Sequence, residues 1–148
     1  MKKHYYIIIF LLVLFDQISK YVFFDLRFME DNYFITPLVN TGISWGIELF
    51  PMDLLIFVTI AIISFIVFLY RKKYIWNIEF ILIFSGAMWN LIDRVYLQWV
   101  RDFADVHFWP VFNMADAYIS IWFLFIVYYT YIMPFFWKKD EKNKEKKK

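Results

Sequence analysis

Four long stretches of the 148-residue chain consist almost entirely of apolar residues. They cover residues 5–24, 54–70, 74–97 and 117–137. Each is close to the roughly 20 residues that a helix needs to cross the hydrocarbon of a bilayer. A helix is the expected form, because hydrocarbon offers no partner for an unpaired backbone group. The pattern therefore predicts an all-α membrane protein built as a four-transmembrane-helix bundle.

Basic residues gather on one side of this predicted bundle. Lysines precede the first span, Arg71 to Lys73 join the second and third, and a lysine-rich segment, residues 138–148, follows the fourth. The positive-inside rule places these segments, and hence both termini, in the cytoplasm. The first span resembles a signal peptide, but Asp16 interrupts it and no small-residue cleavage site follows, so we expect it to be retained. Residues 138–148 are expected to form a disordered cytoplasmic tail.

The amino-acid composition argues against several kinds of catalytic and metal site. Hydrophobic residues make up 62% of the chain, well above the level of a small soluble domain. There is no cysteine, which excludes disulfides and thiolate nucleophiles, and the two histidines are too few for a histidine-rich metal centre. We expect no metal, no cofactor and no nucleic-acid partner.

The two segments on the outer side are residues 25–53 and 98–113. Alternation in "YFITPLV", residues 33–39, indicates a short strand or hairpin near the membrane surface. Asp102, Asp105 and Asp116 lie within fifteen residues of one another, at the start of the fourth span. An ionised carboxylate at the edge of hydrocarbon is costly unless it is paired, hydrated or used in a reaction.

The first span contains two charged residues, Asp16 and Lys20. They are four residues apart and share one helical face. An internal ion pair that makes this face tolerable is favoured over a direct chemical role, which stays open.

The third span contains Gly86, Asn90 and Arg94 at a spacing of four, with Asp93 beside them. Gly86 permits close approach of a neighbouring helix. The polar residues serve either as helix–helix contacts with a snorkelling arginine, or as part of a functional cluster at the outer end. Because they share one face at the depth of the three aspartates, we favour function.

"FNMADAYI" puts Asn113 at a helix-cap position and Asp116 in the first turn, where capping alone accounts for both. "VNTGISWG", residues 39–46, reads by itself as a turn. However, two aspartates at one wet site can share a proton, because repulsion keeps one of them neutral. Such a pair hydrolyses an amide without metal or thiol, as in aspartic proteases.

The ordered set "DQISK", "NTGISWG", "GAMWNLIDR", "VRDF" and "FNMAD" resembles the lipoprotein signal peptidase (signal peptidase II) family. The resemblance implies one peptidase domain, residues 1–137, in the bacterial cytoplasmic membrane, with a small extracytoplasmic β-like cradle beside the four helices. It also implies an aspartic endopeptidase that removes signal peptides from prolipoproteins by cleaving before the diacylglyceryl-modified cysteine. The expected partners are prolipoproteins and membrane lipid, and the chain is expected to act as a monomer.

Matching motif to motif, the resemblance implies a role for each polar residue. Asp102 and Asp116 match the catalytic pair. The residues that match substrate-backbone contacts are Asn40, Asn90, Arg94 and Asn113. The residues that match supporting positions are Asp16, Lys20, Gly86 and Asp93. Asp105 matches no catalytic position, and Arg101 replaces an apolar residue, where it is expected to bias which catalytic acid is ionised.

Two other classes of protein compete with this interpretation. A small ion-coupled transporter would use Asp16, Lys20, Asp93 and Arg94 as a charge relay, but it predicts charges at the midplane of several spans, and the second and fourth spans carry none. A non-enzymatic membrane scaffold would use the aspartates only as caps, and it predicts that replacing both with asparagine preserves function.

Overall fold

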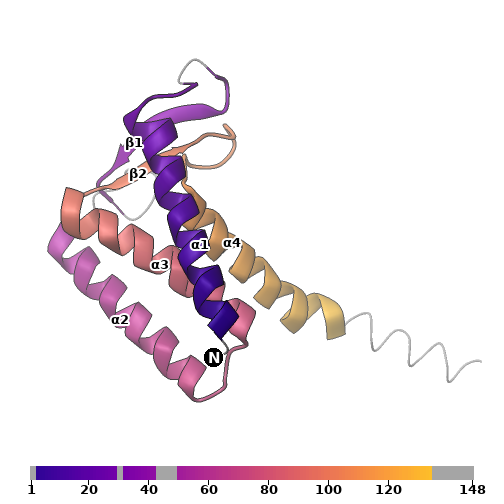
Figure 1. Ribbon diagram of the computed structural model, residues 1–148. Coiled ribbons are helices and arrows are strands. Elements are labelled where there is room, and N and C mark those ends of the chain that lie inside the picture. The colour runs from indigo at the N-terminus through magenta and orange to yellow at the C-terminus, as the bar shows by residue number, and fades with distance from the viewer. Residues whose placement is uncertain (1–2, 30–31, 43–49, 135–148) are drawn as a thin grey trace, which may run out of the picture.

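The computed structural model describes residues 3–29, 32–42 and 50–134. Its α-helices are α1 (Lys3–Lys20), α2 (Met52–Arg71), α3 (Asn77–Leu97) and α4 (Met114–Val127) (Figure 1). Two of them continue as π-helical turns, α1 as η1 (Tyr21–Asp25) and α4 as η2 (Tyr128–Ile132). With these turns included, all 4 helices are long and apolar enough to cross a membrane. The prediction of a four-helix membrane protein is confirmed.

Local hydrogen bonds explain where two helices begin. α3 begins at Asn77, later than the expected residue 74, because Glu79 Oε2 accepts a hydrogen bond from the backbone N–H of Trp76 at 2.6 Å. α4 begins at Met114, earlier than the expected residue 117, because Asn113 caps it. The expected end of the fourth span at residue 137 and the tail, residues 138–148, lie outside the described residues.

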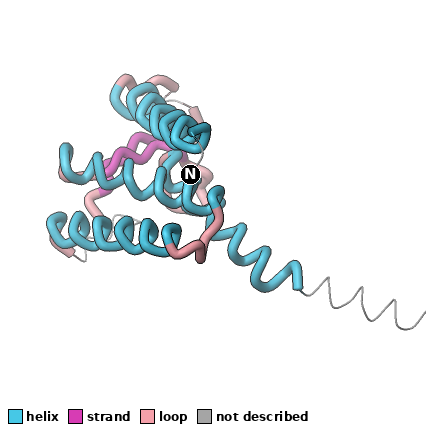
Figure 2. The backbone as a smooth tube through the Cα atoms, turned by 60° about the horizontal axis from the view of Figure 1, so that its bottom comes forward, coloured by secondary structure: helices cyan, strands magenta, loops and turns pink. Residues whose placement is uncertain are grey.

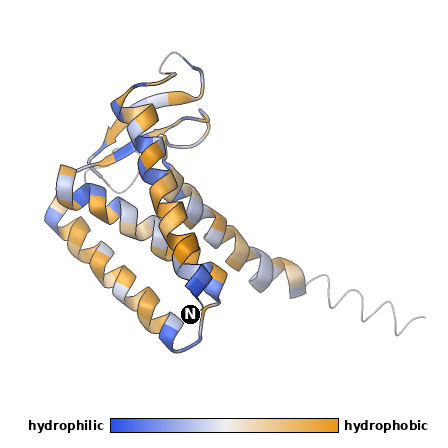
Figure 3. Ribbon diagram, in the orientation of Figure 1, coloured by the Kyte–Doolittle hydropathy of each residue, from blue (hydrophilic) through white to orange (hydrophobic). Residues whose placement is uncertain are grey.

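Helix α3 lies at the centre of the bundle and packs against α1, α2 and α4 (Figure 2). A small apolar core of Ile66, Phe80 and Ile83 joins α2 to α3. The outer faces are apolar as well (Figure 3), and large side chains such as Phe57 and Leu124 are well exposed. Hydrocarbon around the bundle accounts for this pattern, since water would disfavour so much exposed apolar surface.

A two-stranded antiparallel sheet covers one end of the bundle (Figure 1). Strand β1 (Ile35–Asn40) pairs with β2 (Val100–Ala104), in a register that sets Leu38 opposite Asp102. The register is irregular between Ile35 and Leu38, where Pro37 lacks an N–H for the ladder. The strand expected in residues 33–39 is confirmed as β1. The alternative of a local hairpin is wrong, because β1 pairs with β2, which follows α3 in the chain.

Gly86 lies at a close contact between α3 and α4. A Cβ atom at residue 86 would stand 2.5 Å from the backbone oxygen of Ala115 and 2.7 Å from Cγ1 of Ile119. The first of these contacts is with backbone, which cannot turn away as a side chain can. The absent side chain therefore sets how near the start of α4 comes to α3.

A Gly86→Ala substitution is expected to lower the free energy of unfolding by about 1–3 kcal/mol, the usual cost of overpacking. Thermal unfolding in detergent measures this. Ser85→Ala is the neighbouring control: Ser85 is fully buried, and its hydroxyl has no hydrogen-bond partner among the described residues, so its loss should leave stability unchanged or slightly higher. Equal melting temperatures for Gly86→Ala and the unmodified protein would contradict the close packing.

Candidate active site

Asp102 and Asp116 come together at the sheet-covered end of the bundle. Asp102 lies in the middle of β2 with 1% of its surface exposed, and Asp116 lies in the first turn of α4. Both line one cavity of about 230 Å³. The other lining residues are Asn40, Ile119, Ser120 and the segment 109–112. Two carboxyl groups therefore face one space near the end of the membrane helices.

Two asparagines hold Asp102 from opposite sides. Nδ2 of Asn40 donates to Oδ2 of Asp102 at 2.9 Å, and Nδ2 of Asn113 donates to Oδ1 at 2.6 Å. The amide of Asn40 is itself fixed, because its Oδ1 accepts from the backbone N–H of Gly42 at 3.0 Å. The carboxyl plane of Asp102 is therefore set by β1 and by the start of α4.

Asp116 is held by Asn90 and by the helix cap. Nδ2 of Asn90 donates to Oδ1 of Asp116 at 2.7 Å, while the backbone N–H of Asn113 donates to Oδ2 at 3.3 Å. Oδ1 of Asn113 accepts from the backbone N–H of Asp116 at 3.1 Å. Asn113 thus contacts both aspartates, and the cap that α4 needs also joins the two acids.

A buried ion cluster stands behind these amides. Nζ of Lys20 lies 2.9 Å from Asp16 and 3.2 Å from Asp93, and all three side chains are fully buried. Lys20 also donates to Oδ1 of Asn90 at 3.2 Å, which orients the Asn90 amide so that its Nδ2 faces Asp116. Asp16 accepts from the backbone N–H of Ala115 at 2.9 Å. The cluster therefore contacts both the helix that carries Asp116 and the amide that binds it.

Arg101 does not act on Asp102 as the sequence suggested. Its guanidinium turns away to Asp93 at 3.0 Å, Asp25 at 2.7 Å and Gln17 at 2.7 Å. The reason is alternation along β2, which sends neighbouring side chains to opposite faces. The expected bias on the ionisation of Asp102 is wrong in this arrangement. Sequence reasoning also missed Asp25 and Gln17, whose only signal is that Gln17 lies within the "DQISK" segment and Asp25 shortly after it.

Arg94 and Asp105 complete the set of predicted polar residues. Arg94, on α3, is half-buried and close enough to Asp116 and Asp102 for charge interaction, and its Nε has no hydrogen-bond partner among the described residues. Asp105 accepts from the backbone N–H of His107 at 2.7 Å and lies 3.2 Å from its Nδ1. Asp105 does not line the cavity, so it is a neighbour of the site.

Burial and the nearby Asp116 raise the pKa of Asp102 from 3.8 to about 7. The hydrogen bonds from Asn40 and Asn113 oppose this rise but do not cancel it. Asp102 therefore keeps its proton close to neutral pH. In the part of the chain that the structure describes, no group of three or more His, Asp and Glu residues is placed to hold a metal ion.

An Arg101→Ala substitution should lower the free energy of unfolding by about 1–3 kcal/mol, because it leaves hydrogen-bonded carboxylates without a partner. Arg101→Lys keeps the charge and should recover part of the loss. Denaturant titration in mixed micelles compares the two. If Arg101→Ala and Arg101→Lys were both as stable as the unmodified protein, the contacts from β2 to Asp93 and Asp25 would contribute nothing.

The fold and the site together define a multi-pass membrane protein with two carboxyl groups at one cavity. The family model for Signal peptidase (SPase) II matches residues 8–132. A lipoprotein signal peptidase of Staphylococcus haemolyticus is 33% identical over 147 residues, covering 86% of this chain and 93% of that protein. One from Halothermothrix orenii is 31% identical over 134 residues, covering 84% and 92%. The solved structure of a bacterial membrane enzyme superposes with a TM-score of 0.73 at 31% identity, covering 84% of this chain and 85% of that one.

The chain belongs to the signal peptidase II family. It is therefore a membrane protease of bacterial type, and the resemblance drawn from its motifs is confirmed.

Proposed function

We propose that this protein is an aspartic endopeptidase that removes the signal peptide of prolipoproteins, cleaving before the diacylglyceryl-modified cysteine, with Asp102 and Asp116 as its catalytic pair. The observation that carries the proposal is the cavity that both carboxyls line, with Asp102 able to hold a proton near pH 7. One neutral and one charged carboxyl are what metal-free amide hydrolysis requires. The names of the relatives supply the substrate class.

In the proposed reaction, a water molecule lies between the two carboxyls. Asp116, ionised and favoured in that form by the α4 N-terminus, takes a proton from the water. The water oxygen attacks the carbonyl carbon of the residue before the cysteine, while Asp102 donates its proton to the carbonyl oxygen. The tetrahedral intermediate, which now carries two hydroxyls, then collapses and the C–N bond breaks. The cysteine nitrogen receives the proton held by Asp116, and one hydroxyl returns a proton to Asp102 as the new carboxyl group forms.

The residues proposed to contact the substrate backbone are Asn40, Asn90, Arg94 and Asn113. The three asparagine amides already bind the aspartates, so their first role is to orient the carboxyls. Arg94 is the better candidate for a substrate carbonyl, because its buried Nε lacks a partner among the described residues. A peptide carbonyl left without a partner at this depth would cost roughly 2–7 kcal/mol.

We further propose that both termini face the cytoplasm and that the cavity opens near the extracytoplasmic face of the cytoplasmic membrane. The support is the charge distribution, since the connection between α2 and α3, which follows Arg71 and contains Lys72 and Lys73, lies at the end of the bundle away from the sheet (Figure 1). The enzyme is proposed to act as a monomer on substrates that enter from the bilayer.

The direct test is incubation of the purified protein in detergent with a diacylglyceryl-modified prolipopeptide. The proposal expects one cleavage, before the modified cysteine, that a chelator does not inhibit. Mass spectrometry of both products locates the cut. Cleavage at another bond, or no cleavage of the lipid-modified peptide, would refute the substrate proposal.

The cleavage rate is expected to fall as the pH rises above about 7, because Asp102 then loses the proton that it must donate. The fall should approach tenfold per pH unit, as for a single essential acid. A pH–rate profile on the same prolipopeptide measures this. An activity that still increases above about pH 8 would contradict Asp102 as the acid.

A further inference from the structure

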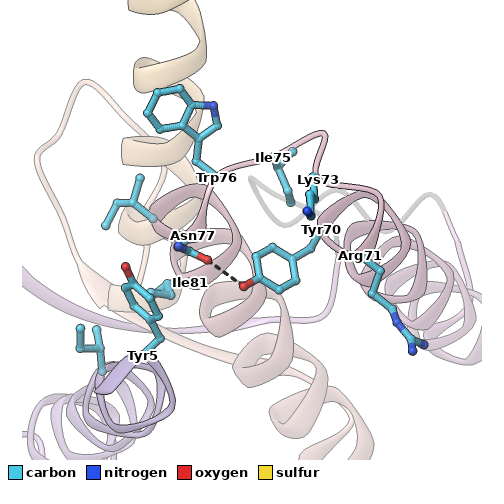
Figure 4. Close-up of a pocket in the computed structure, with 10 residues that line it drawn as sticks. Tyr5, Tyr70, Arg71, Lys73, Ile75, Trp76, Asn77 and Ile81 are labelled. Carbon is cyan, nitrogen blue, oxygen red and sulfur yellow. Dashed lines mark hydrogen bonds between the residues drawn. The ribbon is translucent and has the colours of Figure 1, made fainter. Parts of the chain in front are cut away.

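A larger cavity, of about 740 Å³, lies around the connection between α2 and α3 (Figure 4), at the end of the bundle away from the sheet (Figure 1). It is an open groove, lined by the first two turns of α1, the end of α2, the connection that follows and the start of α3. We call it the basal groove. Its lining residues are Tyr5, Ile8, Tyr70, Arg71, Lys73, Ile75, Trp76, Asn77, Ile78 and Ile81.

The rim of the basal groove is cationic and rich in hydrogen-bond donors. Arg71 and Lys73 are exposed and neither forms an ion pair with another described residue. The described residues that line the groove include no carboxylate. The hydroxyl of Tyr70 donates to Oδ1 of Asn77 at 2.7 Å, as Figure 4 shows, which leaves the Asn77 amide N–H₂ for an acceptor. An anion is the ligand that satisfies these groups.

The walls of the basal groove are apolar. Ile8 and Ile78 are exposed on neighbouring helices, and Ile81 is buried with 1% of its surface exposed. Trp76, at 76% exposure, stands at the rim, where tryptophan is favoured at the boundary between hydrocarbon and water. The groove thus joins a cationic rim to an apolar wall on a surface that faces lipid.

We propose that the basal groove binds an anionic phospholipid, with the headgroup phosphate at Lys73 and an acyl chain along Ile8 and Ile78. The exposed Arg71 side chain, whose guanidinium points away from Asn77 in Figure 4, turns toward the phosphate when the lipid binds. Basic pockets between membrane helices on the cytoplasmic side recognise such headgroups. Charge complementarity selects this occupant. A basic peptide segment would be repelled by the rim, and a zwitterionic lipid brings a cation against it. The site is separate from the aspartates and does not depend on their role.

Native mass spectrometry of the full-length protein, released from detergent with added lipid, tests this proposal. Phosphatidylglycerol is compared with phosphatidylcholine of the same acyl chains and with soluble glycerol phosphate. Lys73→Gln and Arg71→Gln remove the rim charges one at a time. Lys72→Gln is the matched control, since it removes the same charge from the same connection, but Lys72 lies over the Phe68 ring at 5.8 Å and does not line the groove.

We expect phosphatidylglycerol to bind saturably, and Lys73→Gln and Arg71→Gln each to weaken it by about fivefold, the usual effect of one cation near an anionic headgroup. Lys72→Gln should change the affinity by less than about twofold. If Lys72→Gln and Lys73→Gln lost the same affinity for phosphatidylglycerol, general charge attraction would explain the binding, and the proposed site would be wrong. Equal retention of phosphatidylcholine, or equal affinity for soluble glycerol phosphate, would overturn the anionic-lipid assignment.

Discussion

Asp116→Asn and Asp102→Asn are each expected to reduce prolipopeptide cleavage by at least about 10³-fold, with the fold retained. Asparagine at residue 116 keeps an oxygen for the Asn90 amide, now at 2.7 Å, but can no longer accept a proton from water. Asparagine at residue 102 keeps the volume of the carboxyl but has no acidic proton to donate. Single-turnover cleavage, with melting temperature measured on the same samples, separates lost chemistry from lost folding.

Asp105→Asn is the control for this pair. It lies three residues from Asp102 in the sequence, yet it binds His107 and does not line the cavity, so its cleavage rate should stay within about twofold. Full turnover by Asp116→Asn, or an inactive Asp105→Asn, would show that the wrong carboxyls had been paired.

Lys20→Met is expected to have the largest effect on stability, a loss of about 3–5 kcal/mol in the free energy of unfolding. Methionine matches the length of the lysine stem, but it leaves Asp16 and Asp93 fully buried with the charge between them gone. Cleavage should fall as well, because the Asn90 amide loses the donor that orients it toward Asp116. Denaturant unfolding in mixed micelles measures the first effect and prolipopeptide turnover the second.

Lys3→Met is the matched control, because Lys3 lies on the same helix and is exposed. Its effect on stability should stay within about 0.5 kcal/mol. Lowering the pH should return part of the stability of Lys20→Met, because a neutral carboxyl costs less to bury than a charged one. If Lys20→Met and Lys3→Met had the same free energy of unfolding at every pH, the buried ion cluster would not support the site.

The helices and the cluster of polar residues were predictable from the sequence because each depends on short-range patterns. The apolar runs are long enough to specify spans, and Asn113 three residues before Asp116 is a helix-start signal that the structure follows. Asp16 and Lys20 at a spacing of four had to share one helical face, and they form a 2.9 Å ion pair.

Contacts between segments far apart in the chain were not predictable in the same way. Strand β2 has only five residues, two of them charged, and its pairing with β1 depends on α2 and α3 bringing the segments together. The effect expected of Arg101 on Asp102 was wrong because it did not take into account that both residues lie on one strand, where neighbouring side chains point to opposite faces. The contact of Arg101 with Asp25 spans 76 residues, a distance that no local pattern reports.

Asp102 and Asp116 are proposed to share one proton at rest, and infrared difference spectroscopy of the carboxyl C=O band measures that proton directly. As the pH rises, the band of one protonated carboxyl should disappear near pH 7. The band should be absent in Asp102→Asn, whereas Asp105→Asn should show the same band and the same pH dependence as the unmodified protein. In Asp116→Asn the same band should vanish at a lower pH, because the neighbouring charge is gone. An unchanged band in Asp102→Asn, or its loss in Asp105→Asn, would contradict the claim.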